Sequence, residues 1–472
     1  MIPGRRTNPS FRPSYRRQGL LLLVLDACAI FAVFNFIAAL RGLSLHGEGV
    51  LLIELIPAYL LATFALYLID GYTLRTDMTS LDYASQHLIA LTLAGLAALL
   101  LTFAVIPSSL GGDALRASRG VIVFSFLTVA LPTLGYRRMF RFRQQRRHGL
   151  RSIVFVGPQE SYEAFAASYQ RSGMTQPLIA TVVENLSNSP FQTTVAGHLT
   201  LEAVLARIER GELGVEAIVL RESGRDLETK VSEQLLALYF GGVPTYTVEL
   251  FNDIYWRKIP LYRINQTWLF QEGFQIARVP VFARVKRVSD ILLSTVGLIV
   301  TAPVLALAAL AIWIEDRGPI FFRQSRTGLN REPFELVKLR SMHVSKGGGE
   351  LYTLPGDSRI TRVGAFLRTT RIDELPQLLN VLRGEMSLIG PRAEWTRLVE
   401  TYQEKIQSYH YRHLVKPGIT GWAQVNYPYG ASLEDTRRKL EYDLYYVKHF
   451  SFVMDAAIVL KTIHVMVFGK GR

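Results

Sequence analysis

Hydrophobic residues gather in long runs near the start of the chain and return in one further run in its second half. The early runs cover Gly19–Leu40, Val50–Ile69, His87–Ile106 and Gly120–Tyr136. Each has about the ~20 residues that a helix needs to cross ~30 Å of hydrocarbon. No small-residue cleavage site follows the first run, so we predict an uncleaved membrane helix. The pattern predicts a basic tail at 1–17 and a four-helix transmembrane bundle at 18–140.

Basic residues flank this predicted bundle on both sides. The tail before it holds Arg5, Arg6, Arg12, Arg16 and Arg17. The exit from the fourth run holds Arg137, Arg138, Arg141, Arg143, Arg146, Arg147 and Arg151. Positively charged flanks stay in the cytoplasm, and an even number of crossings puts both flanks on that side.

One carboxylate, Asp26, lies inside the first apolar run. A lone charge in lipid is costly, so the side chain faces a helix neighbour or the headgroups. Two interpretations stay open for Asp26: a lipid-contact or assembly site, or plain packing within the bundle or near the headgroups.

Short apolar stretches alternate with helix-like ones between residues 145 and 275. The strand-like segments are SIVFVG, LIATVV, EAIVLR and VPTYTV. Alternation of this kind predicts a parallel sheet with helical crossovers, a Rossmann-like α/β domain. Its first turn, Gly157-Pro158-Gln159-Glu160, lacks the G-x-G-x-x-G pattern that lets a pyrophosphate approach the backbone. An assembly or regulatory domain is therefore favoured over a nucleotide-binding one, and the domain is a candidate homodimer contact.

The last long apolar run, Ile291–Ile314, contains Pro303 near its middle. Proline removes a backbone hydrogen bond, so a break or kink is expected there. A spanning helix would move the remainder of the chain to the outer face. A re-entrant helix at about 288–314 would keep it in the cytoplasm, which suits the many Lys and Arg beyond it.

Composition agrees with a membrane protein that meets anions. Hydrophobic residues make up 49%, and 53 basic against 39 acidic residues give a formal charge of +14. Such an excess suggests lipid headgroups, nucleic acid or phosphorylated substrates. The basic residues flank membrane segments and lie in a motif suited to phosphate binding, so nucleic acid is not expected as a partner. The single cysteine, Cys28, excludes an intramolecular disulfide and a cysteine cluster for zinc.

The segment RTTRIDELPQLLNVLRG carries the strongest chemical signal. Pro376 suits the first turn of a helix, which places Asp373 and Glu374 at the helix start. Amide groups exposed there favour an anion, and adjacent carboxylates can hold Mg²⁺ together with phosphate oxygens. Arg368 and Arg371 flank the pair, and guanidinium groups fit phosphate. Taken alone, the two carboxylates could simply complement the helix dipole, worth ~0.3–1 kcal/mol.

The ordered blocks across residues 276–472 closely resemble the bacterial sugar transferase family, the polyprenyl-phosphate hexose-1-phosphate transferases. The matching positions are Lys286, Arg287, Asp290, Gly318, Pro319, Gln324, Arg326, Gly328, Lys338, Arg340, Ser341, Met342, Arg368, Asp373, Glu374, Leu375, Pro376, Gln377, Leu378, Asn380, Gly384, Gly390, Pro391 and Arg392. The early helices and the α/β domain resemble the long form of the family. The resemblance implies a mainly α-helical catalytic domain at 276–472 with a re-entrant helix. One departure is Ala302, where many members have Ser, and whether the Thr301 hydroxyl takes over the bond to the helix backbone stays open.

The resemblance also implies roles for individual residues. Asp373 would be the nucleophile, and Asp373 and Glu374 would hold Mg²⁺. Phosphate- and substrate-binding roles would fall to Gln324, Arg326, Lys338, Arg340, Arg368, Arg371 and Arg392. For Trp422, stacking on a uridine base and a structural turn both remain open.

The implied reaction moves a hexose-1-phosphate from a UDP-sugar to undecaprenyl phosphate, releases UMP and passes through an aspartyl-phosphosugar. UDP-glucose or UDP-galactose would be the donor, and exopolysaccharide, capsule or O-antigen (lipopolysaccharide) synthesis the pathway. The enzyme would be a multi-pass protein of the bacterial inner membrane, among membrane lipids, with its catalytic domain on the cytoplasmic face. Its rivals are a glycosyltransferase that leaves the phosphate behind and a scaffold of polysaccharide assembly.

Overall fold

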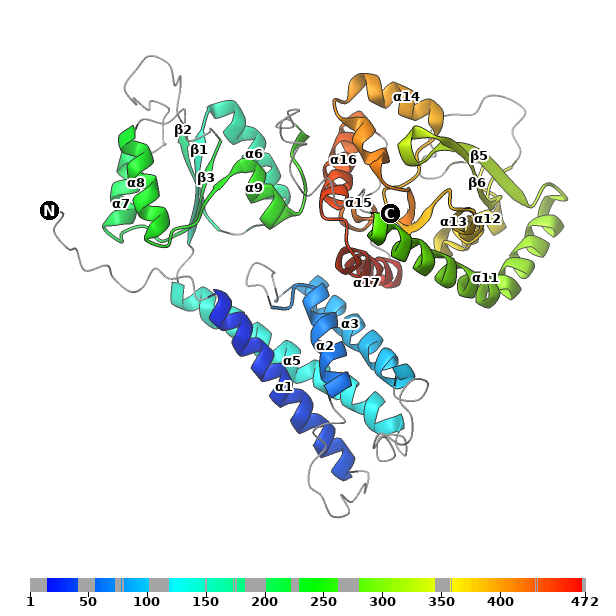
Figure 1. Cartoon of the computed structure of the whole chain (residues 1–472), viewed down its shortest axis with the longest axis horizontal. Helices are drawn as coiled ribbons and strands as arrows, with labels where there is room; N and C mark the ends of the chain where they lie inside the picture. Colours follow the sequence, from blue (N-terminus) through cyan, green and yellow to red (C-terminus); the bar gives the residue numbers. More distant parts are fainter. Residues whose placement is uncertain are drawn as a thin grey trace. The chain divides into compact units, whose positions relative to one another are not determined.

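The computed structural model describes most of the chain (Figure 1). The described residues are 15–40, 56–72, 78, 80–101, 119–148, 151–172, 174, 176–182, 201–221, 229–261, 280–343, 357, 359–428, 430 and 432–468. Residues 1–14 of the predicted tail, the first part of the second apolar run and the end of the third lie outside these ranges. The chain divides into two compact units, Met1–Trp256 and Arg257–Arg472.

The predicted membrane bundle is present as four helices. They are α1 (Tyr15–Leu40), α2 (Ile56–Leu68), α3 (Leu81–Leu100) and α5 (Arg119–His148). Contacts join α1 to α5, α2 to α3 and α3 to α5. In the described residues, α2 is a 13-residue helix and is shorter than the predicted run, whereas α1, α3 and α5 are long and apolar enough to span a membrane. The fourth helix of sufficient length is α11 in the second unit, so the chain is a membrane protein.

Helix α5 runs past the predicted end at Tyr136 and continues to His148. Arginine and glutamine are good helix formers, so the basic exit sequence continues the apolar helix. Arg137, expected as one of several basic flank residues, is instead fully buried.

Asp26 faces Arg137 inside the bundle, and this settles the question that the sequence left open. Both guanidinium ends of Arg137 lie 2.7 Å from the carboxylate oxygens, and both side chains are fully buried. Tyr72 donates to the same carboxylate at 2.6 Å, and Tyr136 donates to it as well. The pair therefore joins α1 to α5 and to the end of α2, which makes Asp26 a packing element of the bundle.

Breaking this buried pair is expected to destabilise the bundle strongly. Asp26→Leu or Arg137→Leu alone leaves an uncompensated buried charge, so we expect a loss of about 3–5 kcal/mol. Thermal unfolding in detergent of the single variants measures the loss. The double variant should recover most of the stability, because no unpaired charge remains. Arg143→Leu, at an exposed position of the same helix, is the control. A double variant no better than the singles would contradict the pairing.

The predicted α/β domain is confirmed as a four-stranded parallel sheet in the order β2-β1-β3-β4. Its strands are β1 (Ser152–Gly157), β2 (Leu178–Val182), β3 (Val215–Leu220) and β4 (Thr245–Thr247). Helices α7 (Leu201–Glu209) and α8 (Thr229–Phe240) pack on one apolar cluster. Helices α6 (Gln159–Arg171) and α9 (Val248–Phe251) pack on the other. Burial on both faces explains why the strands read as continuous apolar runs.

The turn after β1 is occupied by a side chain of the chain itself. A Cβ at Gly157 would lie 2.4 Å from the Cβ of Arg221, and the Arg221 Nε donates to Ser161 at 2.7 Å. This arrangement agrees with the lack of a dinucleotide-binding sequence at the same turn.

The second unit combines helices with two small strand pairs. Its helices are α11 (Pro280–Asp316), α12 (Arg362–Thr370), α13 (Gln377–Arg383), α14 (Thr396–Lys405), α15 (Trp422–Asn426), α16 (Leu433–Lys448) and α17 (Phe452–Phe468). Strands β5 (Phe321–Thr327) and β6 (Pro333–Leu339) form an antiparallel hairpin, and β7 (Ser387–Ile389) and β8 (Gly418–Thr420) form a parallel pair. The sequence predicted a mainly α-helical unit with the helices that became α11 and α13, but none of these strands.

Helix α11 is one continuous helix with Pro303 inside it, so the chain does not break there. Figure 1 shows that α11 changes direction partway along its length. A straight helix of 37 residues would be about 55 Å long. Thr301 donates to the Gly297 carbonyl at 2.7 Å, so Thr301 supplies the backbone-bonding hydroxyl.

Both ends of α11 are fastened to the same unit. Near its start, Lys286 pairs with Asp455 of α17 at 2.5 Å, and Arg287 donates to the last carbonyls of α13. Asp290 accepts from Ser387 and from the Leu388 N–H at 3.1 Å. At the other end, Asp316 is paired with Arg340. The basic pair and the aspartate at the head of this helix therefore anchor it to α13, α17 and β7 of the same unit.

A large apolar core under α14, α16 and α17 supports the second unit. Trp422 is 1% exposed in this core, stacks on Tyr445, and donates to the Arg257 carbonyl at 2.9 Å. It cannot stack on a uridine base in this position, and the structural alternative for Trp422 holds. The same contact, with Lys258 paired to Glu441, ties residues from Arg257 onward to this unit.

Candidate active site

Two neighbouring elements bring the predicted catalytic residues together. Strand β6 carries Lys338, and a 3₁₀ turn at Ile372–Glu374 carries Asp373 and Glu374. The turn contacts β6, and Asn380 of α13 accepts from the Val337 N–H of that strand. Arg371, with a φ of 61°, ends α12 and reverses the chain into the turn. The helix that follows Pro376, α13, is seven residues long and begins at Gln377, as the position of Pro376 predicted.

Asp373 is almost fully buried, with 6% of its surface exposed. Its Oδ1 atom has no hydrogen-bond partner among the described residues. Burial and the neighbouring Glu374 raise the pKa of Asp373 to about 6, against the opposing effect of Lys338, Arg368 and Arg371. A carboxylate that is more basic than usual yet still ionised at neutral pH is suited to nucleophilic attack.

Glu374 faces two cations. Its Oε1 lies 3.3 Å from Arg392 and 3.5 Å from Arg371. Burial works to raise the pKa of Glu374, but Arg392, Arg371 and Lys338 outweigh it and hold that pKa below its usual value. These cations therefore favour the ionised form of Glu374.

Lys338 lies beside the same carboxylates, with its ammonium 5.2 Å from the Phe322 ring centre. Burial and the positive charges of Arg326 and Arg392 lower the pKa of Lys338 to about 8, against the pull of Asp373 and Glu374. The protein compensates the positive charge of this ammonium only in part, so a bound phosphate would stabilise its charged form.

Arg392 sits on a loop whose backbone is held closely. A Cβ at Gly418 would come within 2.0 Å of the Gly390 N atom, so only glycine lets the two segments pack. The buried Arg412, paired with Asp443 at 2.8 Å, donates to the Arg392 carbonyl at 2.9 Å. These contacts fix the backbone from which the Arg392 side chain reaches Glu374.

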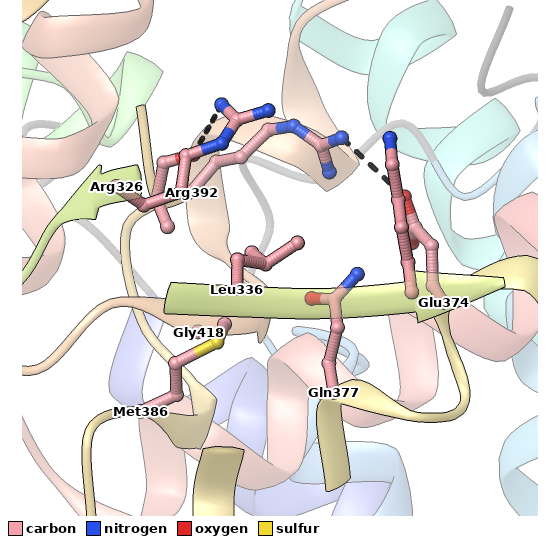
Figure 2. Close-up of a pocket in the computed structure, with 9 residues that line it drawn as sticks. Arg326, Leu336, Glu374, Gln377, Met386, Arg392 and Gly418 are labelled. Carbon is pink, nitrogen blue, oxygen red and sulfur yellow. Dashed lines mark hydrogen bonds and ion pairs between the residues drawn. The ribbon is translucent and has the colours of Figure 1, made fainter. Parts of the chain in front are cut away.

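Figure 2 shows the pocket that these residues surround, with Arg326, Arg392 and Glu374 along one side. The pocket is lined by Arg326, Leu336, Lys338, Glu374, Gln377, Met386, Arg392, Ala393 and Gly418. The sequence singled out Arg326, Lys338, Glu374 and Arg392 as site residues. It missed the pocket role of Met386 and Gly418, and it included Gln377 among the family matches without giving it a pocket role.

Other predicted binding residues have protein partners. Arg326 donates to the Ala393 carbonyl at 3.0 Å and to Gln324 at 2.5 Å. Arg340 is bound to Asp316 at the end of α11 and does not line the pocket. Arg368, in the last turn of α12, acts on Asp373 by charge. Arg371 and Arg392 thus pair with Glu374, Lys338, Arg368 and Arg371 act on Asp373 by charge, and Arg340 holds the end of α11.

The two carboxylates fit a divalent cation in their chemistry. No group of three or more metal-binding side chains occurs in the described ranges, and the pair Asp373 and Glu374 stands without a third carboxylate. Mg²⁺ usually takes one or two carboxylates and fills its remaining positions with phosphate oxygens and water. The free Oδ1 of Asp373 leaves one ligand position available.

A membrane-anchored enzyme that handles phosphate groups is the class that this fold and site define. The sequence profile described as "Bacterial sugar transferase" matches residues 281–469. The chain is 36% identical over 269 residues to a UDP-N-acetylgalactosamine-undecaprenyl-phosphate N-acetylgalactosaminephosphotransferase of Aeromonas hydrophila, covering 57% of this chain and 63% of that one. It is 43% identical over 202 residues to a UDP-glucose:undecaprenyl-phosphate glucose-1-phosphate transferase of Caulobacter vibrioides, covering 42% of this chain and 75% of that one.

A protein of the same name from Escherichia coli strain K12 is 43% identical over 181 residues, or 38% of this chain and 39% of its own length. The chain belongs to the bacterial sugar transferase family, and its matched region is that of a phosphoglycosyl transferase. It spans less than two thirds of the Aeromonas and E. coli relatives.

Proposed function

We propose that the protein transfers a hexose-1-phosphate from a UDP-sugar to undecaprenyl phosphate and releases UMP, as the first membrane step of exopolysaccharide, capsule or O-antigen synthesis. The observation that carries this proposal is the buried, unpartnered Asp373 carboxylate, surrounded by cations beside the pocket. The Caulobacter and E. coli relatives are named for this transfer with glucose and the Aeromonas relative for it with N-acetylgalactosamine. A glucose or galactose donor remains part of the proposal.

The reaction has two displacements. An Asp373 oxygen attacks the β-phosphorus, the bond to the bridging oxygen of the diphosphate breaks, and UMP leaves with that electron pair. An oxygen of the acceptor phosphate then attacks the same phosphorus, and the aspartyl bond breaks to restore the carboxylate. Splitting one displacement into two lets a single carboxylate serve both substrates. No general base is needed, because the acceptor is already an anion.

Positive charge supplies most of the stabilisation in this scheme. Arg392 and Lys338 would contact the phosphate oxygens, and Arg371 and Arg368 would act on the site by charge. Phosphoryl transfer depends chiefly on positioning and on neutralising charge in this way. Mg²⁺, held by Asp373 and Glu374, would add a further positive charge against the diphosphate.

The bent α11 supports a site on the cytoplasmic face. Undecaprenyl phosphate keeps its headgroup at the interface, and UDP-sugars are cytoplasmic, so the site belongs at the inner leaflet. A re-entrant α11 leaves both of its ends on one side of the membrane. Its apolar residues, including Leu292, Val296, Ile299 and Leu307, are exposed in the chain and suited to lipid.

Product analysis tests the proposal directly. Purified protein in detergent is incubated with undecaprenyl phosphate and a panel of UDP-sugars. Release of UMP with a lipid-linked sugar diphosphate is expected. Release of UDP would instead identify a glycosyltransferase that leaves the phosphate behind, and no turnover with any sugar would favour a scaffold.

The alkaline limb of the pH profile is expected to report Lys338. Its pKa is lowered to about 8, so the rate should fall above about pH 8 as the ammonium loses its proton and its attraction for phosphate. Lys338→Arg keeps the charge to a much higher pH and should move this limb upward. Steady-state rates from pH 6 to 10 measure it. An identical limb in the two proteins would remove Lys338 from the phosphate site.

A further inference from the structure

Helix α13 contains two buried amide side chains with opposite surroundings. Asn380 is fully buried and Gln377 is 5% exposed, and the two lie three residues apart on the same short helix. The hydrogen bonds of Asn380 show a structural role, whereas the Gln377 amide is available to a ligand.

Asn380 has its bonds made within the chain. Its Oδ1 accepts from the Val337 N–H at 3.1 Å. Its Nδ2 donates to the Glu335 carbonyl and to Glu385, both at 2.6 Å. This amide joins α13 to β6, and both of its N–H donors are used within the chain.

Gln377 makes no such bonds. Within the described part of the chain, its carboxamide has no hydrogen-bond partner. Figure 2 shows its side chain rising from the start of α13 with the amide group at the pocket end, below Glu374. Its amide atoms are not among the buried unpaired polar atoms, so the amide end is open to the pocket and its N–H groups are available to a ligand there.

The other groups around Gln377 indicate which part of a substrate it meets. Gln377 lies three residues after Glu374 and shares the pocket with Lys338 and Arg392. The neighbouring Leu336 and Met386 are 6% and 1% exposed, so the pocket floor is packed core. The cations at the rim of the pocket therefore favour an anionic ligand. The Gln377 amide can donate an N–H hydrogen bond to such an anion without adding positive charge to the site.

We propose that Gln377 is a substrate-contacting residue whose amide N–H donates to a non-bridging oxygen of the phosphate that is transferred with the sugar. The proposal rests on the function proposed above. A bond to this phosphate assists formation of the covalent intermediate and stays with the phosphate afterwards, whereas a bond to the nucleotide would be lost with UMP.

Two leucine variants separate this role from a structural one. Gln377→Leu removes an unpaired amide and should leave the thermal midpoint of the ligand-free protein unchanged or raised, whereas Asn380→Leu should lower it. With UDP-sugar at low concentration, Gln377→Leu should lower kcat/KM roughly tenfold to a hundredfold, the size expected for a lost bond to a charged group. Inhibition by UMP should be unchanged.

Inorganic pyrophosphate provides a readout that does not depend on turnover. It should raise the thermal midpoint of the wild-type protein, and the rise should be smaller in Gln377→Leu. If the wild type releases no UMP, the proposed function fails, but the pyrophosphate shifts of the two proteins still test whether Gln377 contacts a phosphate. An equal rise in both proteins, a midpoint of Gln377→Leu as low as that of Asn380→Leu, or UMP inhibition weakened by the same factor as kcat/KM would each overturn the assignment.

Discussion

Asp373→Asn is expected to abolish turnover, with the rate falling roughly a thousandfold or more. The amide matches the carboxylate in size but cannot form the ester to phosphorus. Asp373 is buried and its Oδ1 is unpartnered, so replacing the charge with an amide should not destabilise the fold. Loss of activity at an unchanged or higher thermal midpoint would therefore report chemistry and not unfolding.

Mass spectrometry of the intact protein gives the decisive measurement. Wild-type protein incubated with UDP-sugar without acceptor should gain the mass of one sugar phosphate, on the peptide that contains Asp373, and Asp373→Asn should gain none. Glu404→Gln, a carboxylate removed at an exposed position of α14, should behave as wild type. An adduct of equal yield in Asp373→Asn would end the assignment of the nucleophile.

Local pattern was enough to predict most of the fold. The strands of the α/β domain read as apolar runs because the sheet is covered on both faces. The β5–β6 hairpin was missed because its strands mix charged and apolar residues, with Arg323, Gln324 and Arg326 on one of them. Its pairing depends on contacts with α13 and the 3₁₀ turn, which no short window contains.

The sequence predicted the carboxylate pair of the candidate site but not the partners of its arginines. Asp373 and Glu374 are adjacent in sequence, so their proximity needed no structure. The partners of the arginines are distant in sequence: Arg137 pairs with Asp26, Arg340 with Asp316, and Arg412 with the Arg392 carbonyl. An arginine in a motif indicates an anion nearby, but only the fold tells whether that anion is a substrate or an aspartate of the chain.

Removal of divalent metal is the second change expected to abolish activity. EDTA should stop UMP release, and added Mg²⁺ should restore it, because two carboxylates and a diphosphate together match the ligands that Mg²⁺ prefers. Glu374→Gln should raise the Mg²⁺ concentration for half-maximal rate by about tenfold or more. Glu404→Gln should leave that concentration unchanged.

The structure offers Glu374 a second role that the same titration can separate. Its Oε1 faces Arg392 and Arg371, so Glu374 could serve mainly to orient those two cations. In that case Glu374→Gln would raise the KM for UDP-sugar and leave the Mg²⁺ curve in place, because the guanidinium groups and not the metal would have lost a partner. A shifted Mg²⁺ curve would assign Glu374 to the metal. Full activity in EDTA would remove the metal from both carboxylates and leave the charge neutralisation to Lys338 and the arginines.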